Sequence, residues 1–208
     1  MISAQEALYR LREGNRRFVQ DIHAPPQFRF DPGKDLPDTQ EPFAVILGCS
    51  DSRVPVEIIF NQGLGDLFVI RVAGNIVAPS QVGSVEFAAE RFKTRLVVVL
   101  GHSGCGAVLA TLEQLEQPQQ GHSRNLLSIV ERVRESVAEL MDTDLRHNRD
   151  ALMQHAVRAN IRASANHLRH GSPVIEEFIQ KQGLVVVGAE YSLDTGIVDF
   201  FDGVPVGD

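Results

Sequence analysis

The stretch LVVVLGHSGCGAV, residues 96–108, decides the fold of this chain and carries its first chemical signal. Its five consecutive apolar residues, 96–100, predict a strand that is buried on both faces of a sheet. The run CGAVLATLEQL at 105–115 then predicts a helix. A buried strand that leads directly into a helix is the repeating unit of a parallel α/β sheet.

The same alternation continues on both sides of this stretch. Further apolar runs predict three more strands, at 43–49, 67–72 and 184–191. Helical patterns separate the strands, at 56–63, 83–92, about 123–140, about 150–168 and 172–183. Ser172 and Pro173 begin the last of these helices with a cap and a first-turn proline, and Gly183 ends it.

The run IVDFF at 197–201 follows a turn and predicts an antiparallel edge strand. We therefore expect an α/β fold with a mostly parallel central sheet, an antiparallel edge strand and flanking helices. No composition shift or internal repeat divides the chain, so we expect residues 1–208 to form one domain.

Residues 1–42 have a different character. Ser3 and Glu6 form a capping box that begins an amphipathic helix. Its apolar positions fall on one face: Leu8, Leu11 and Phe18. Residues 23–42 hold five prolines and a glycine, which predict a loop or an arm. A helix at the end of such an arm has little core of its own to cover, so we expect it to pack on another subunit.

Composition narrows the class of protein. The net charge of −7 and the lack of a basic stripe argue against a nucleic-acid binder. The longest apolar runs are far too short to span a membrane. The N-terminus lacks the basic start and apolar block of a signal peptide, so we expect a cytoplasmic protein.

The chain has only two cysteines, Cys49 and Cys105. Neither belongs to a Cys-x-x-Cys redox pair, and a reducing cytoplasm disfavours a disulfide between them. Two cysteines also exclude a structural zinc site with four cysteine ligands. A zinc site in this chain therefore needs a histidine or a carboxylate as well.

Two segments, GCSDSRVP at 48–55 and GHSGCGAV at 101–108, each begin where an apolar strand ends. Ligands bind at this edge of open α/β sheets. If the two strands are neighbours, Cys49, His102 and Cys105 meet there. Two thiolates and one imidazole leave a fourth zinc position open, as in catalytic rather than structural sites. The helix start favours a thiolate at Cys105.

Asp51 and Arg53 follow Cys49 closely and allow two arrangements. Asp51 can fill the fourth zinc position, which would block catalysis. It can instead pair with Arg53 and accept a proton from zinc-bound water or hydroxide. Alone, Cys49 is typical of a buried strand cysteine, Asp51 of a helix N-cap and Arg53 of a surface residue. The joint occurrence of these residues favours the metal site.

The pattern CSDSRVP, followed some fifty residues later by HSGCG, resembles the β-class carbonic anhydrases. The resemblance extends through FVIRVAGN at 68–75 and GSVEFA at 83–88. It implies zinc ligands at Cys49, His102 and Cys105, with Asp51 and Arg53 as a catalytic dyad. It also implies obligate dimers that exchange their N-terminal helices, which fits the helix and arm of residues 1–42.

The resemblance also separates subtypes. Gln40 lies nine residues before Cys49 and matches the plant-like subtype, in which this glutamine donates a hydrogen bond to substrate across the dimer interface. The other subtype, known for a bicarbonate-locked inactive state, has a tryptophan where this chain has Ile46. The chain retains three other residues of that inhibitory pocket: Val54, Arg71 and Tyr191. We favour the plant-like subtype, and acid-driven closure of the site by Asp51 stays open.

Three apolar residues match the substrate cleft of the plant-like enzymes: Phe68, Ala73 and Phe87. Phe87 replaces a more usual tyrosine. An apolar cleft suits carbon dioxide, although ordinary core packing is the plain alternative for these residues. The sequence identifies no proton shuttle.

We therefore expect a lyase, a carbonic anhydrase that uses one Zn²⁺ per chain. Its zinc-bound hydroxide would reversibly hydrate carbon dioxide to bicarbonate and a proton. We expect a homodimer or a higher homo-oligomer without nucleic-acid or membrane partners. The alternatives are hydrolysis of carbonyl sulfide or carbon disulfide on the same scaffold, and a non-catalytic zinc-dependent dimer.

Overall fold

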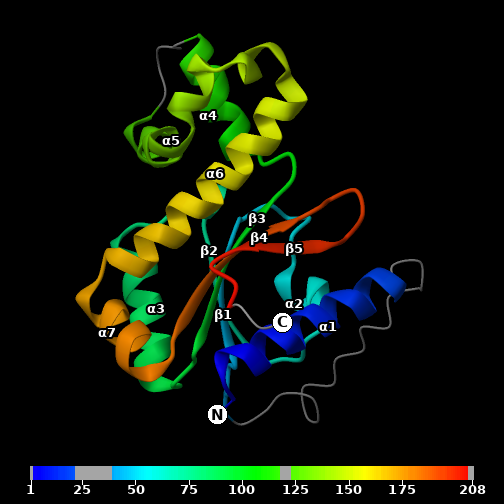
Figure 1. The fold of residues 1–208 in the computed structure, drawn as a ribbon, viewed down its shortest axis with the longest axis vertical. Helices are drawn as coiled ribbons and strands as arrows, with labels where there is room; N and C mark the ends of the chain where they lie inside the picture. Colours follow the sequence, from blue (N-terminus) through cyan, green and yellow to red (C-terminus); the bar gives the residue numbers. More distant parts are fainter. Residues whose placement is uncertain (1, 22–38, 118–122, 206–208) are drawn as a thin grey trace.

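The computed structural model of the chain describes residues 2–21, 39–117 and 123–205. Five strands form one sheet in the order β2-β1-β3-β4-β5 (Figure 1). Their bounds are Ala44–Gly48 for β1, Leu67–Arg71 for β2, Leu96–His102 for β3, Val185–Tyr191 for β4 and Val198–Asp202 for β5. The first four strands pair in parallel and β5 pairs antiparallel to β4. The predicted fold class and its antiparallel edge strand are confirmed.

The helices match the predicted segments. They are α1 Ala4–Asp21, α2 Val56–Ile59, α3 Pro79–Arg91, α4 Gly106–Glu116, α5 Arg124–Val137, α6 Arg149–His170 and α7 Pro173–Gln182. Three short 3₁₀ helices complete the set: η1 Ala73–Asn75, η2 Ala138–Asp142 and η3 Asp144–His147. Within the described ranges, none of the helices has both the length and the apolar character that a bilayer span requires.

Local signals explain where the helices begin and end. Helix α3 begins earlier than its apolar pattern predicts, because Pro79 occupies the first turn. The hydroxyl of Ser172 accepts a hydrogen bond from the backbone N–H of Ile175 and caps α7. Gly183 follows α7 in the left-handed conformation, as the sequence predicts.

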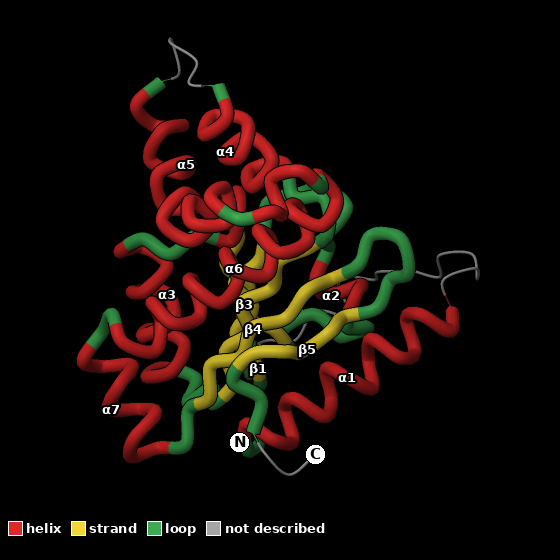
Figure 2. The backbone as a smooth tube through the Cα atoms, turned by 45° about the horizontal axis from the view of Figure 1, so that its top comes forward, coloured by secondary structure: helices red, strands yellow, loops and turns green. Residues whose placement is uncertain are grey.

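The sheet separates two apolar layers. Along β1, Val45 and Leu47 pack into the layer covered by α3 to α7, and Ala44 and Ile46 pack into the layer covered by α1 and α2 (Figures 1 and 2). Every residue of β1 and β3 is buried. Burial on both faces explains why these two strands are continuous apolar runs rather than alternating ones.

Helix α1 packs against its own chain. Its N-terminal cap is the predicted one, since the Ser3 hydroxyl accepts a hydrogen bond from the backbone N–H of Glu6. Leu8 and Leu11 are fully buried in the apolar layer between the sheet and helices α1 and α2. The expectation that α1 has little core of its own to cover is therefore wrong in this structure, and its exchange between subunits stays a prediction.

Two residues of α1 allow this helix to pack closely against the rest of the chain. A Cβ atom at Gly14 would lie 1.8 Å from the carbonyl oxygen of Phe60, so only glycine allows this approach. The side chain of Asn15 is buried and forms hydrogen bonds with three backbone groups outside α1. It donates to the carbonyl oxygens of Ile59 and Gly196 and accepts from the N–H of Val198.

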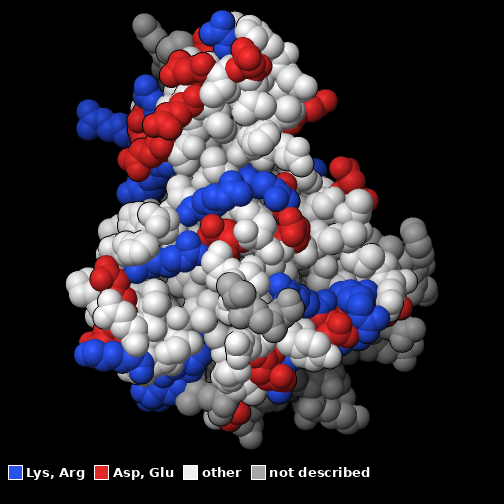
Figure 3. Space-filling view, viewed as in Figure 1, with Lys and Arg blue, Asp and Glu red and all other residues white. Residues whose placement is uncertain are grey.

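Charges of both signs interleave on the face seen in Figure 3. Arg158 of α6 pairs with Glu190 of β4 and Asp199 of β5, and its guanidinium lies 4.5 Å from the ring centre of Phe201. These contacts fix the middle of α6 over the antiparallel edge of the sheet.

Candidate metal centre

Neighbouring strand ends bring Cys49, His102 and Cys105 together. Cys49 follows β1, His102 is the last residue of β3, and Cys105 immediately precedes α4. Strands β1 and β3 are parallel neighbours, so both end at the same edge of the sheet. All three residues are buried and their ligand atoms lie within 4.8 Å of one another. Among the described residues, no other group of three or more histidine, cysteine or acidic side chains is close enough to share a metal ion.

The imidazole of His102 is oriented for metal binding. Its Nδ1 lies 2.9 Å from the carbonyl oxygen of Ser103, so Nδ1 carries the proton and donates it there. Its Nε2 is buried and has no hydrogen-bond partner. A buried polar atom without a partner is costly, whereas metal-binding histidines usually hold one nitrogen by such a second contact. The ring therefore fits a metal at Nε2.

The two sulfur atoms also fit a metal. They lie 4.0 Å apart, and both thiols are free. A disulfide would need about 2.05 Å between them. Two sulfurs bound to one tetrahedral zinc ion, each at about 2.3 Å, would lie about 3.8 Å apart. The donor types and their spacing therefore suit zinc without a large movement of either side chain.

The pKa values of the two thiols are linked because their sulfur atoms are in contact. The hydrogen bond from Cys105 lowers the pKa of Cys49 to about 4; burial opposes this shift and His102 adds to it. The Cys49 sulfur and burial instead raise the pKa of Cys105, and the N–H groups of Ala107 and Val108 at the helix start offset this only in part. The pair therefore forms one thiolate readily. A second thiolate so close needs a cation beside it.

Asp51 is paired with Arg53, one of the two arrangements that the sequence allowed. Arg53 Nε donates to Asp51 Oδ1 at 2.9 Å and Nη2 donates to Oδ2 at 2.8 Å. The backbone N–H of Arg53 also donates to Oδ1. These bonds hold the pKa of the Asp51 carboxyl well below its usual range, although burial opposes them. Asp51 Oδ2 remains 3.9 Å from His102 Nε2, beside the ligand atoms.

Arg71 fixes the loop that carries Cys49 and Asp51. Its guanidinium donates to the carbonyl oxygen of Cys49 at 3.0 Å and to that of Asp51 at 2.6 Å. The other residues compared with the inhibitory pocket are buried: Ile46, Val54 and Tyr191. In this structure Arg71 therefore serves the metal loop, and its guanidinium is engaged with two carbonyl oxygens.

Of the residues predicted to contact substrate, Ala73 lies near the metal ligands and Gln40 does not. Ala73 lies in η1, next to the residue whose N–H reaches the Cys49 sulfur. Gln40 is exposed and precedes β1, at the opposite end of that strand from Cys49. A strand of five residues spans about 16 Å. Gln40 is therefore far from the metal ligands of its own chain.

Phe68 and Phe87 also lie away from the ligands. Phe68 pairs with Val45, near the start of β1, and its ring centre is 6.1 Å from that of Phe87 on α3. Phe87 is 52% exposed. A single chain thus holds the metal ligands together but leaves these aromatic rings at the side of the sheet.

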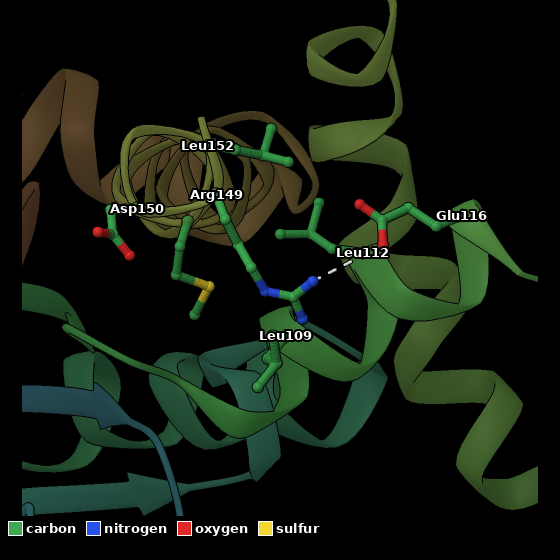
Figure 4. Close-up of a pocket in the computed structure, with 7 residues that line it drawn as sticks. Leu109, Leu112, Glu116, Arg149, Asp150 and Leu152 are labelled. Atoms are coloured by element: carbon green, nitrogen blue, oxygen red, sulfur yellow. Dashed lines mark ion pairs between the residues drawn. The ribbon is translucent and has the colours of Figure 1, made fainter. Parts of the chain in front are cut away.

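Two hollows lie outside the site. A cavity of about 130 Å³ between α4 and α6 has apolar walls and is closed by Arg149, which pairs with Glu116 (Figure 4). Its apolar wall is made by Leu109, Leu112, Leu152 and Met153. None of these residues carries a group suited to the chemistry expected here, and none is a metal ligand candidate.

A larger groove of about 690 Å³ lies between α5 and α6. His167 and His170, which have the sequence spacing of a helical metal pair, both line it. They do not belong to the group of side chains close enough to share a metal ion. The groove therefore gives no second metal site among the described residues.

One contact with the candidate ligands could not be predicted from the sequence. The backbone N–H of Gly74 donates to the sulfur of Cys49 at 3.4 Å. Asn160 in turn donates to the carbonyl oxygen of Gly74. The glycine within FVIRVAGN was the only local signal, because the asparagine lies 86 residues farther along the chain.

Comparison with known proteins gives consistent matches over most of the chain. A family model described as carbonic anhydrase matches residues 44–198. Carbonic anhydrase 2 of Mycobacterium tuberculosis is 40% identical over 190 residues, which cover 89% of this chain and 87% of the relative. The structure of the β-carbonic anhydrase CafA of Aspergillus fumigatus has a TM-score of 0.71 at 25% identity, covering 97% of this chain and 91% of that one. A tetrameric β-carbonic anhydrase of Sordaria macrospora has a TM-score of 0.68 at 26% identity, covering 95% and 97%.

Proposed function

The chain belongs to the carbonic anhydrase family, in its β class, and is an enzyme of that class; we propose that it acts through one Zn²⁺ ion held by Cys49, His102 and Cys105. The reaction is the reversible hydration of carbon dioxide to bicarbonate and a proton. The observation that carries the proposal is the buried, unpartnered Nε2 of His102, within 4.8 Å of two cysteine sulfurs.

A zinc ion held there would lower the pKa of a water molecule that it binds, to about 7 in the most favourable sites, and so supply hydroxide at neutral pH. The chain supplies the matching charge. Cys49 and Cys105 as thiolates and His102 as neutral imidazole balance the two positive charges of the ion. The site can then accept a hydroxide without an excess of negative charge.

Asp51 orients the nucleophile in this proposal. Its carboxylate is ionised because Arg53 lowers its pKa, and two side-chain hydrogen bonds fix its direction. Oδ2 lies 3.9 Å from His102 Nε2, where it would accept a hydrogen bond from a hydroxide held beside the ligand atoms. A lone pair of the hydroxide oxygen would then point toward the carbon of the substrate. A group that is already oriented adds no reorganisation cost to the reaction.

The substrate side of the site is completed by a second copy of the chain. Gln40, Phe68 and Phe87 lie away from the ligands of their own chain, so we propose that they serve the site of a partner. Gln40 would donate a hydrogen bond to a substrate oxygen and the two rings would line an apolar entry for carbon dioxide. This is the arrangement of the plant-like subtype, and one similar structure is a tetramer.

Two measurements test this function. The zinc content of the purified protein should be close to one ion per chain. In stopped-flow assays of carbon dioxide hydration, Asp51→Ala should be about 10²- to 10⁴-fold slower than the wild type with zinc retained. Asp194→Ala, at an exposed aspartate in a turn, is the matched control and should keep the wild-type rate.

Two results would contradict the proposal. Substantial hydration in Asp51→Ala would remove Asp51 from the mechanism. A wild-type preparation that is fully folded but binds no zinc would refute the metal site. The same assay with carbonyl sulfide and carbon disulfide separates this function from the alternative hydrolases. A zinc-loaded protein without any of these activities would favour the non-catalytic dimer.

A further inference from the structure

The sulfur of Cys49 is held by the backbone of a separate segment. The N–H of Gly74 donates to it at 3.4 Å, an ordinary distance for a hydrogen bond to sulfur. A thiolate ligand that accepts such a bond is fixed in direction and carries less free charge. The position of this single N–H therefore matters for the metal centre.

A tight turn determines where the N–H of Gly74 points. The N–H of Asn75 donates to the carbonyl oxygen of Val72 at 3.0 Å and closes a four-residue turn over residues 72–75. Gly74, the third residue, has φ 70° and ψ 16°, as in a type II turn. In a type I turn the peptide between Ala73 and Gly74 is flipped, and the same N–H would point away from Cys49.

The turn carries a small cost at Asn75. This residue has φ 44°, a left-handed conformation that asparagine adopts more readily than most residues but less readily than glycine, and its side-chain Nδ2 is buried without a partner. Gly74 adopts its own left-handed conformation without strain. A contact from outside the turn would offset the cost at Asn75.

Asn160 of α6 makes that contact. It is 2% exposed, and its Nδ2 donates to the carbonyl oxygen of Gly74 at 2.7 Å. The carbonyl belongs to the peptide directly after the one that faces Cys49. With the N–H of Asn75 on Val72 and the carbonyl of Gly74 on Asn160, this peptide is fixed from both ends. Gly74 is thereby held in place beside Cys49, and its N–H stays within reach of the sulfur.

We propose that Asn160 is a positioning residue of the metal centre: its amide holds the Gly74 carbonyl and so keeps the Gly74 N–H on the sulfur of Cys49. The proposal rests on the proposed zinc site. It assigns a task to a buried polar side chain that touches neither a ligand nor substrate. Replacement of a residue that orients a metal ligand without binding the metal typically lowers metal affinity 10- to 100-fold.

The first test is the rate at which the holoenzyme loses zinc to an excess of a chromophoric chelator. Asn160→Leu keeps the branched shape and the number of heavy atoms of the side chain and removes the donor; Asn160→Ser is too short to reach the carbonyl. Both should lose zinc about 10-fold faster or more. Ser164→Ala is the matched control, because Ser164 is a buried polar residue one turn along the same helix and faces the separate groove.

The second test measures how strongly the Cys49 sulfur donates electrons to a bound metal. In cobalt-substituted protein, the sulfur-to-metal charge-transfer band should move to longer wavelength in the Asn160 variants, because Cys49 loses a hydrogen-bond donor. Ser164→Ala should leave the band in place. General loosening of the fold would speed zinc loss without a shift of this band.

Wild-type zinc loss and an unshifted band in either folded Asn160 variant would overturn the inference. The proposed function would still stand in that case, since the wild type would bind zinc and hydrate carbon dioxide. A wild type without zinc would overturn both. Faster zinc loss together with the band shift, in both Asn160 variants and not in the control, supports the inference.

Discussion

The two ends of strand β1 differ in whether the predicted site residues of one chain converge there. At the carboxyl end, Cys49 meets His102 and Cys105 although 53 residues separate Cys49 from His102. At the amino end, Gln40 is exposed although it is only nine residues from Cys49. Parallel pairing gathers residues that are distant in sequence, while the strand itself keeps near ones apart. The proposed metal ligands therefore meet within one chain, whereas Gln40, proposed to bind substrate, lies away from them.

The largest expected effect is at the carboxyl end. Cys49→Ser replaces a soft thiolate with a hydroxyl, which is a poor zinc ligand. Zinc content should fall to a small fraction of one ion per chain, and hydration should fall more than about 100-fold, beyond the range typical of residues behind the ligands. Metal analysis and stopped-flow kinetics measure the two. His167→Ala, at an exposed histidine, is the control; full zinc in Cys49→Ser would contradict the ligand set.

The next effect concerns α1, which covers its own chain in this structure. Asn15→Ala removes the partner of three buried backbone groups, so the free energy of unfolding should fall by about 2–3 kcal/mol. Denaturant unfolding measures it, and activity per bound zinc should be unchanged. Wild-type stability in Asn15→Ala would contradict the role of this side chain in packing α1 on its own chain.

A moderate effect is expected at the amino end. Gln40→Ala should slow hydration by about 10-fold, the value of one lost hydrogen bond to substrate, with zinc retained. Co-expression of Gln40→Ala and Cys49→Ser chains tests whether Gln40 acts across the interface. Random pairing would complete about a quarter of the sites, and activity should exceed that of either variant alone. Activity no higher than the mean of the two variants would place Gln40 in its own chain's site or outside catalysis.

The smallest effect is expected at Phe87. Because its ring is half exposed, Phe87→Ala should change the free energy of unfolding by less than about 1 kcal/mol. If the ring lines a partner's cleft, kcat/KM for carbon dioxide should fall about threefold with zinc unchanged. Leu126→Ala, at an exposed leucine on α5, should leave kcat/KM unaltered. Equal effects of the two substitutions would leave Phe87 without a role in the cleft.

Much of this molecule follows from local sequence. Apolar runs locate all five strands within about two residues, since burial on both faces demands them. Ser172 and Gly183 fix α7 because caps act over a few residues. The convergence of Cys49 and His102 also follows, because residues after adjacent parallel strands reach the same edge.

Other features depend on contacts that no local pattern encodes. The close packing of α1 depends on Gly14 and Asn15. Their roles become clear only from their contacts with Phe60 and Val198, which are distant in sequence. The contact of Asn160 with the turn joins segments that lie 86 residues apart. The protonation of the two thiols depends on their mutual contact, on burial and on the imidazole of His102, and not on the helix start alone.

The placement of both cysteines has a practical consequence for anyone who handles this protein. Every sulfhydryl in the sequence belongs to the metal centre, and both are buried. Alkylation followed by intact-mass spectrometry therefore has no background from other thiols, and every adduct marks a molecule in which this part of the sheet edge has opened to the reagent.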